Sequence, residues 1–142
     1  NRGTSALGQS IGKSPLIGSY TQQDLYWLAK MVSAEADGEP YQGKVAVAAV
    51  ILHRVISPEY PNTIKEVLYQ VVNGHYQFTP VLNGYINQVE PTATAYKAAK
   101  DALAGIDPSK GAILYYNPQT STNKWILSKP VTVVIGNHTF AK

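Results

Sequence analysis

The chain has 142 residues, of which 44% are hydrophobic, and this is enough for one domain with its own core. It contains no cysteine, which excludes a disulfide framework, a thiolate metal site and a cysteine nucleophile. The net charge of +3 arises from scattered residues that form no Lys/Arg block, so we expect a solvated basic surface and no nucleic-acid partner. The longest apolar run, Val45–Leu52, is far shorter than the roughly 20 residues that span a bilayer, so no membrane insertion is expected.

The first 20 residues are rich in Gly and Ser and show no regular apolar spacing, which predicts a linker. Residues 21–142 then form the predicted domain. Its first helix should begin at Thr21, because Asp24 follows three residues later as in a capping box, with Tyr20 and Leu25 placed for a hydrophobic staple. The pattern ends near residue 37, ahead of Gly38-Glu39-Pro40.

The segment that follows Gly43 is apolar on every side, which is typical of a helix surrounded by protein. Its valines would also suit a strand, but its continuation to Ser57-Pro58 is long for a strand and favours a central helix. Further helices are predicted from Thr63 to about Gln70 and from Pro91 to Gly105.

After Gly105 the sequence pattern favours strands and turns over helices. A strand is predicted at Ala112–Tyr116, a turn at Asn117-Pro118, and a hairpin in which Val131–Ile135 and His138–Phe140 flank Gly136-Asn137. The predicted fold class is therefore α+β, mostly helical, with a small C-terminal β-hairpin region.

Glu35 falls at the edge of the apolar stripe of the first helix, next round the helix from Leu28. Partial burial against aliphatic side chains would raise the pKa of a carboxyl group, as a general acid that works near neutral pH requires. Periodicity alone leaves an exposed boundary glutamate as the alternative.

Glu39 lies four residues after Glu35, a spacing that would present two carboxylates on one helix face. Gly38 weakens the helix, however, and Pro40 biases the residue before it away from helical dihedral angles. We therefore expect Glu39 to leave that face and to serve in a turn.

The remaining polar residues predict neither a metal nor another cofactor. His53, His75 and His138 are far apart and match no zinc-ligand spacing, and no GxSxG motif marks a serine nucleophile. Ten tyrosines and two tryptophans against two phenylalanines favour side chains that stack on sugars and also donate hydrogen bonds, although core packing explains any single aromatic residue equally well.

The segments EADGEPYQG at residues 35–43 and VAVAAVILHRV at residues 45–55 closely resemble the signature of the SleB/CwlJ-type cell wall hydrolases, the spore-cortex-lytic enzymes. The resemblance runs over residues 22–142. It includes Gln77-Phe78-Thr79, Tyr116-Asn117-Pro118, Lys124-Trp125 and Ile135-Gly136-Asn137-His138-Thr139-Phe140.

This resemblance implies a lysozyme-like or lytic-transglycosylase-like fold with Glu35 as its single catalytic residue. The matching segments outside the catalytic helix imply substrate-binding roles for Phe78, Thr79, Tyr116, Asn117 and Trp125. The implied partner is the glycan strand of peptidoglycan in the cell wall or spore cortex, outside the cytoplasm. No regulatory protein partner is identified. SleB-type members carry an N-terminal wall-binding domain on a linker, which would account for the start of this chain.

The implied reaction cleaves the bond between N-acetylmuramic acid and N-acetylglucosamine, with Glu35 acting first as acid and then as base to leave a 1,6-anhydro end. One alternative is a hydrolase that uses water with help from Glu39 or Glu90, and another is a glycan-binding module without activity. The sequence departs from the family pattern at Asp37, Lys44, His53 and Ala141, which weakens the assignment to spore germination specifically.

Overall fold

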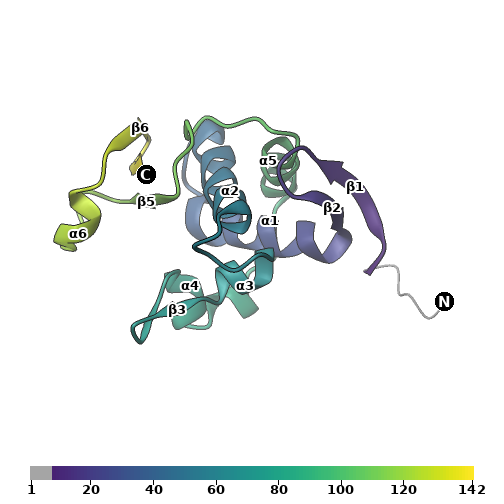
Figure 1. Ribbon diagram of the computed structural model, residues 1–142, viewed down its shortest axis with the longest axis horizontal. Coiled ribbons are helices and arrows are strands. Elements are labelled where there is room, and N and C mark those ends of the chain that lie inside the picture. The colour runs from purple at the N-terminus through teal and green to yellow at the C-terminus, as the bar shows by residue number, and fades with distance from the viewer. Residues whose placement is uncertain (1–7) are drawn as a thin grey trace.

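The computed structural model describes residues 8–142. Three helices form its centre, α1 (Gln22–Ala36), α2 (Tyr41–Ile56) and α5 (Ala93–Leu103), and they pack against one another (Figure 1). Every residue of α2 from Gly43 to Leu52 is buried, which confirms the predicted central helix and explains why its sequence is apolar on every side.

The predicted start of α1 is confirmed in atomic detail. The Asp24 N–H donates to Thr21 Oγ1 over 3.1 Å, and the Thr21 N–H donates to Asp24 Oδ2 over 2.8 Å, so the capping box is complete. The helix ends at Ala36 with Asp37 as its C-cap, at the predicted place.

Helix α2 begins at Tyr41, earlier than the expected start after Gly43. The reason is that the Pro40 carbonyl accepts hydrogen bonds from the N–H groups of Gly43 (2.8 Å) and Lys44 (3.2 Å), which closes the first turn. Proline is well suited to this boundary because its fixed φ is compatible with a helix start and it needs no N–H donor there.

The middle of the chain builds a small lobe, at the lower left of Figure 1, from short elements. They are α3 (Ile64–Leu68), β3 (Val71–Val72), β4 (His75–Tyr76), α4 (Thr79–Leu82) and the 3₁₀ helix η2 (Tyr85–Asn87). The predicted cap at Thr63 is confirmed by its bond from the Glu66 N–H. The β3–β4 hairpin was not predicted, although its turn residues Asn73 (φ +53°) and Gly74 (φ +78°) are a strong hairpin signal.

The C-terminal part forms a second lobe with β5 (Leu114–Tyr116), α6 (Lys124–Leu127), β6 (Val131–Ile135) and β7 (His138–Ala141). The three strands are antiparallel in the order β5-β7-β6, so β7 is central. The hairpin predicted around Gly136-Asn137 is confirmed, with Ile135 paired to His138. The short helix α6 was not predicted.

The N-terminal segment corrects the sequence prediction. Residues 10–19 were expected to form no packed element, but β1 (Ser10–Ser14) and β2 (Gly18–Thr21) pair as an antiparallel hairpin. Leu16, Ile17 and Tyr20 pack against the core. β1 contains one large apolar residue, Ile11, and so gave no periodic signal. Residues 1–7 of the predicted linker lie outside the described residues, and the division into a linker and a domain stays a prediction.

The expected fold class, a mostly helical α+β domain with a C-terminal β-hairpin region, is confirmed. None of the helices in residues 8–142 combines the length and apolar character that crossing a membrane requires.

Candidate active site

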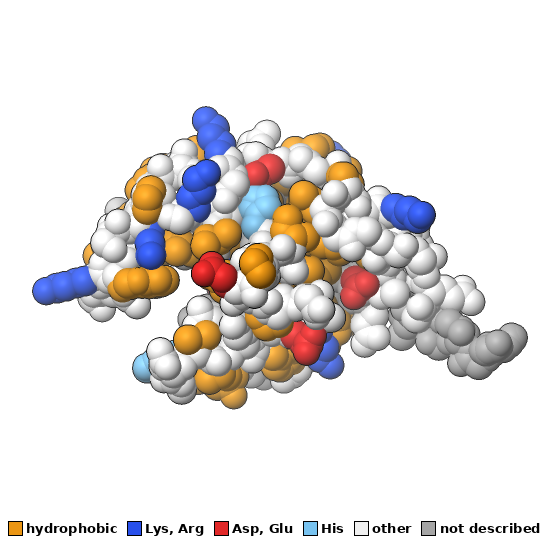
Figure 2. Space-filling view, viewed as in Figure 1, with side chains coloured by type: hydrophobic (Ala, Val, Ile, Leu, Met, Phe, Trp, Pro, Cys, Tyr) orange, Lys and Arg blue, Asp and Glu red, His pale blue; other side chains and the backbone are white. Residues whose placement is uncertain are grey.

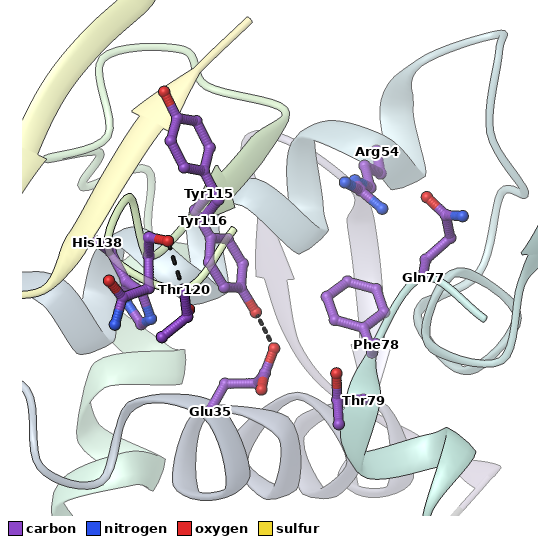
Figure 3. A pocket seen from close by; sticks show the side chains of 10 residues that line it. Glu35, Arg54, Gln77, Phe78, Thr79, Tyr115, Tyr116, Thr120 and His138 are labelled. Carbon is purple, nitrogen blue, oxygen red and sulfur yellow. Dashed lines mark hydrogen bonds between the residues drawn. The ribbon is translucent and has the colours of Figure 1, made fainter. Parts of the chain in front are cut away.

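A cavity of about 290 Å³ lies where α1, β5 and the start of α4 meet. Glu35 projects into it from α1, Tyr115 approaches from β5, and Phe78 and Thr79 form the opposite wall (Figure 3). Its lining residues are Glu35, Arg54, Gln77, Phe78, Thr79, Tyr115, Tyr116, Asn117, Thr120 and His138.

Glu35 is partly buried, and it is the only carboxylate among the described residues that line this cavity. Burial raises the pKa of its carboxyl group, and a hydrogen bond from the Tyr115 hydroxyl to Glu35 Oε1 (2.6 Å) opposes part of that rise. A carboxyl group held in this way retains its proton at a higher pH than an ordinary glutamate. It therefore has the property that a general acid needs.

The Tyr115 hydroxyl is fixed over Glu35 because α2 holds the chain that leads into β5. Arg54 Nε donates to the Ile113 carbonyl over 2.7 Å, and His53 Nδ1 lies 2.6 Å from the Ala112 carbonyl oxygen. His53 Nε2 also lies 3.4 Å from Asp107 Oδ2. Burial and the negative charge of Glu35 raise the pKa of Tyr115 well above its usual value, so Tyr115 acts here as a hydrogen-bond donor.

Arg54 is the cation that lines the cavity, and 7% of the residue is exposed. Its guanidinium carbon lies 4.9 Å from the Tyr60 ring centroid and 5.3 Å from that of Phe78. Its Nη1 atom is buried without a hydrogen-bond partner in the described structure. Phe78 is itself only 2% exposed, so its ring mainly supports Arg54 and the cavity wall.

Glu39 is not in this cavity lining, in keeping with the expectation that it leaves the face of Glu35. Its carboxylate accepts hydrogen bonds from the Asn137 N–H (2.9 Å) and from Asn137 Nδ2 (3.0 Å) at the β6–β7 turn. Desolvation opposes ionisation of Glu39, but these bonds and the charges of His138 and Lys44 outweigh it and lower its pKa. Glu39 therefore ties the α1–α2 connection to the hairpin.

His138 lies beside Glu39 and beside Tyr115, the hydrogen-bond partner of Glu35. Its ring lines the cavity, lies 5.0 Å from the Tyr115 ring, and places Nδ1 4.0 Å from Glu39 Oε1. Burial lowers the pKa of His138, although the charge of Glu39 opposes this. His138 therefore gains a proton less readily than an ordinary histidine.

The structure brings four of the five predicted substrate-binding residues together around Glu35: Phe78, Thr79, Tyr116 and Asn117. Trp125 instead lines an adjoining cavity. Trp125 is 62% exposed, which excludes the alternative that it packs in the core. Glu90, considered as a second carboxylate, is exposed and is not in the lining of the Glu35 cavity.

Several residues that line this cavity were not predicted from the sequence. Tyr115 was predicted only as part of the strand Ala112–Tyr116, and the one chemical role considered for His138 was that of a metal ligand. Arg54 and Gln77 lie within the segments that carry the family resemblance, so their positions in those motifs were the available signal. The contact between Tyr115 and Glu35 joins residues 80 positions apart, and no local pattern reveals it.

Lys44, one of the departures from the family pattern, has a structural role beside this site. It is buried, and its Nζ donates to the carbonyls of Ala36 and Asp37, each over 2.6 Å. These carbonyls end the helix that carries Glu35, and a cation there also interacts favourably with the helix dipole.

Together, a mostly helical α+β fold and a partly buried carboxyl group in an open cavity define a candidate acid–base site. A family model described as "Cell Wall Hydrolase" matches residues 38–141, which is most of the chain. The chain therefore belongs to the cell wall hydrolase family. The match begins three residues after Glu35, so it does not itself test the role of that residue.

Relatives and solved structures agree with this membership. The chain is 46% identical over 123 residues to a spore cortex-lytic enzyme of Bacillus cereus, covering 87% of this chain and 46% of that protein. It is 39% identical over 142 residues to a spore cortex-lytic enzyme of Bacillus subtilis, covering 100% of this chain and 45% of that protein. The chain thus spans just under half the length of these curated relatives.

Two solved structures share the fold. The catalytic domain of the germination-specific lytic transglycosylase SleB from Bacillus anthracis superposes with a TM-score of 0.77 at 46% identity, covering 87% of this chain and 97% of that chain. The catalytic domain of the Bacillus cereus SleB protein superposes with a TM-score of 0.79 at 43% identity, covering 93% of this chain and 99% of that chain.

Proposed function

We propose that this domain cleaves the glycan strands of peptidoglycan, at the bond between N-acetylmuramic acid and N-acetylglucosamine, as a lytic transglycosylase. The observation that carries the proposal is Glu35, a partly buried carboxyl group with a raised pKa and the only carboxylate among the described residues that line the cavity. The proposed substrate is spore cortex peptidoglycan, outside the cytoplasm, because the relatives are named for cortex lysis.

In the proposed first step, protonated Glu35 donates its proton to the glycosidic oxygen while the bond from that oxygen to C1 of the muramic residue breaks. Positive charge then develops at C1. The carboxylate that Glu35 becomes when it has given up its proton accepts a hydrogen bond from the Tyr115 hydroxyl, and this bond stabilises it as it forms.

In the second step, the 6-hydroxyl oxygen of the same muramic residue bonds to C1, and its proton passes to the Glu35 carboxylate. A 1,6-anhydro end results, no water is consumed, and Glu35 returns to its protonated state. A single carboxyl group is sufficient for this sequence. A hydrolase with a second carboxylate is less well supported, because Glu39 is held at the β6–β7 turn and Glu90 is not in the lining.

The side chains proposed to bind substrate around the reacting bond are Phe78, Thr79, Tyr116 and Asn117, with Trp125 at the adjoining cavity. A sugar ring offers an apolar face for stacking and a rim of hydroxyl groups for hydrogen bonds. The Tyr116 and Trp125 rings suit the face, Thr79 and Asn117 suit the rim, and the buried Phe78 ring shapes the cavity wall.

Mass spectrometry of the fragments released from purified cortex peptidoglycan tests this proposal. Muramic ends lighter by one water than reducing ends are the expected product. Reducing muramic ends would identify a hydrolase instead. Binding to peptidoglycan without release of any soluble fragment would identify a glycan-binding module and overturn the proposed activity.

A further inference from the structure

The turn that leads into β5 is folded around one carboxylate, that of Asp107. Its Oδ1 atom accepts hydrogen bonds from the Ser109 N–H (2.9 Å) and from the Ser109 hydroxyl (2.5 Å), and its Oδ2 atom accepts one from the Gly111 N–H (2.7 Å). Gly111 has φ +84°, a left-handed conformation that glycine adopts without strain. Asp107 therefore holds the turn in one shape, and β5 begins three residues after Gly111.

One side chain of α2, His53, contacts both ends of this turn. Its Nδ1 atom lies 2.6 Å from the Ala112 carbonyl oxygen, and its Nε2 atom lies 3.4 Å from Asp107 Oδ2. A carbonyl oxygen only accepts hydrogen bonds, so Nδ1 carries the proton of the first contact, and Nε2 faces the carboxylate. The imidazole ring thus joins α2 to the carboxylate of the turn and to the backbone just before β5.

The position of this backbone affects the Glu35 carboxyl group through Tyr115. The Tyr115 hydroxyl donates to Glu35 Oε1 over 2.6 Å (Figure 3). Because β5 pairs only with β7 in the described sheet, the contacts from α2 to the segment before β5 are a second support for Tyr115. Hydrogen bonds between oxygen atoms rarely exceed about 3.0 Å, so a displacement of Tyr115 by roughly 1 Å would break this bond.

The titratable and charged side chains that line the cavity with Glu35 come from three elements. They are Arg54 from α2, Tyr115 and Tyr116 from β5, and His138 from β7. Among these described residues, Tyr115 is the one that hydrogen-bonds to Glu35, and this bond lowers the pKa of Glu35 against the rise that burial causes. His53 and Asp107 are not in the lining, so Tyr115 is their link to Glu35.

We propose that His53 and Asp107 form a positioning pair that holds the Tyr115 hydroxyl on Glu35 and so sets the pH at which this acid loses its proton. The inference deepens the proposed function and rests on it, since it names residues outside the cavity that tune the proposed general acid. Its consequence is that a substitution at His53 changes the acid without changing any side chain that lines the cavity.

The test measures the pKa of Glu35 in the absence of substrate, by NMR of its carboxyl carbon as a function of pH. His53→Ala and Tyr115→Phe should both raise this pKa, because each removes or loosens the bond that favours the ionised form. We expect His53→Ala to give at least about half of the rise in Tyr115→Phe. The double variant should give no more than Tyr115→Phe alone, because both substitutions act through one bond.

His53→Asn is the conservative variant. Asparagine retains an N–H donor for the Ala112 carbonyl but loses the link to Asp107, so the pKa of Glu35 should lie between those of the wild type and His53→Ala. It also takes the place of His53→Ala in the double variant if the alanine variant does not fold. An unchanged pKa of Glu35 in the variant that is used would then count against the pair.

Thr92→Ala controls for a general loss of stability. Thr92 Oγ1 accepts a hydrogen bond from the Ala95 N–H over 3.0 Å and caps α5, which packs against α2 far along the chain from the turn at Asp107. The variant should melt at a lower temperature and leave the pKa of Glu35 in place. A rise as large as that in His53→Ala would mean that loosening the domain is sufficient, and would overturn the proposed pair.

Cleavage assays separate this inference from the proposed function. If the domain cuts peptidoglycan, the alkaline limb of kcat/KM against pH should move to higher pH in His53→Ala, as in Tyr115→Phe. If the wild type releases no fragments, the proposed function fails, and the NMR titration alone decides the inference. A folded His53→Ala with an unchanged pKa of Glu35, or a double variant whose rise is the sum of the two single rises, would overturn it.

Discussion

Two carboxyl groups four residues apart, Glu35 and Glu39, occupy opposite electrostatic environments. Burial raises the pKa of Glu35, whereas hydrogen bonds from Asn137, helped by His138 and Lys44, lower that of Glu39. Environments that separate two pKa values in this way also separate two roles. Glu35 is suited to hold its proton at a higher pH than an ordinary glutamate, and Glu39 is suited to remain ionised and anchor the turn.

We predict that Glu35→Gln lowers glycan cleavage by at least about 100-fold, because glutamine retains the shape of the side chain but delivers no proton. The substitution should not lower the stability of the fold. A carboxyl group whose pKa is raised by folding stabilises the fold below its unfolded pKa and loses that contribution as pH rises through the folded pKa. Glutamine is free of this pH-dependent loss, so at neutral pH the variant should melt at the same temperature as the wild type or higher.

Glu39→Gln is the matched control for this prediction. It removes charge from the bonds to Asn137 and should mainly lower the melting temperature, with a far smaller effect on cleavage per folded molecule. Equal losses of activity in the two folded variants would favour the hydrolase with two carboxylates.

The hydrogen bond from Tyr115 gives a second prediction, on pH dependence. This bond favours the ionised form of Glu35, so Tyr115→Phe should raise the pKa of Glu35 further. Activity that needs protonated Glu35 is lost as pH rises through that pKa. The alkaline limb of the profile of kcat/KM against pH should therefore move to higher pH in Tyr115→Phe.

Tyr41→Phe provides the comparison, because the Tyr41 hydroxyl also donates to a carboxylate, that of Asp101 over 2.5 Å, but Tyr41 is not in the lining of the Glu35 cavity. Its alkaline limb should stay in place. A limb that moves to lower pH in Tyr115→Phe would contradict the assignment of Glu35 as the acid.

At the scale of elements, the sequence predicted what depends on local signals. The Thr21 capping box and the Gly136-Asn137 hairpin turn are encoded within a few residues, and both are confirmed. The β1–β2 hairpin was missed because β1 contains a single large apolar residue, Ile11, and so shows no apolar periodicity. The hairpin packs on the core through Leu16, Ile17 and Tyr20, and that core surface is provided by other segments. The same holds for the site. The place of Glu35 at the edge of the core was predictable from helical periodicity, but its contact with Tyr115 requires the complete fold.

The β6–β7 turn gives an element-scale prediction. Gly136 has φ +57°, and a Cβ atom there would lie 2.4 Å from Glu39 Oε1 and 2.8 Å from Pro40 Cδ. Gly136→Ala should therefore destabilise the domain by more than the roughly 1–2 kcal/mol that a left-handed conformation alone costs an alanine.

Gly18→Ala isolates the contribution of the backbone. Gly18 has φ +78° at the start of β2, directly after the β1–β2 turn, and a Cβ atom added there would meet nothing within 4 Å beyond its chain neighbours. Denaturant unfolding of both variants should show the smaller loss for Gly18→Ala. Equal losses would mean that the contact between the β6–β7 turn and Glu39 contributes nothing beyond the conformational cost.

For the whole molecule, charge is distributed unevenly although no basic block appears in the sequence. All charged residues after Asp107 are lysines, namely Lys110, Lys124, Lys129 and Lys142. Lys and Arg side chains accordingly gather on the C-terminal lobe in the space-filling view (Figure 2). The preceding residues contain nearly equal numbers of acidic and basic side chains, so this lobe provides the net positive charge.

We predict that binding to isolated, negatively charged cell walls weakens as salt rises, because the Debye length falls from about 10 Å at 0.1 M to about 3 Å at 1 M ionic strength. Sedimentation of the protein with wall fragments at increasing sodium chloride concentration measures this. The double variant Lys110→Gln/Lys142→Gln should weaken this salt dependence, because it removes two positive charges. Neither lysine is in the lining of either cavity, so the variant leaves the cavity linings unchanged. Binding that is insensitive to salt would show that uncharged contacts alone hold the wall.

The central position of β7 affects when the site can exist during the life of the chain. β5 carries Tyr115 and, in the described sheet, pairs only with β7, which lies more than 20 residues further along the chain. Helix α2 holds the chain at Ala112 and Ile113, but the β5 strand itself gains its strand partner only when β7 is in place. During folding, Glu35 would therefore be present in its helix before its site is complete, and docking of β7 would be the step that completes it.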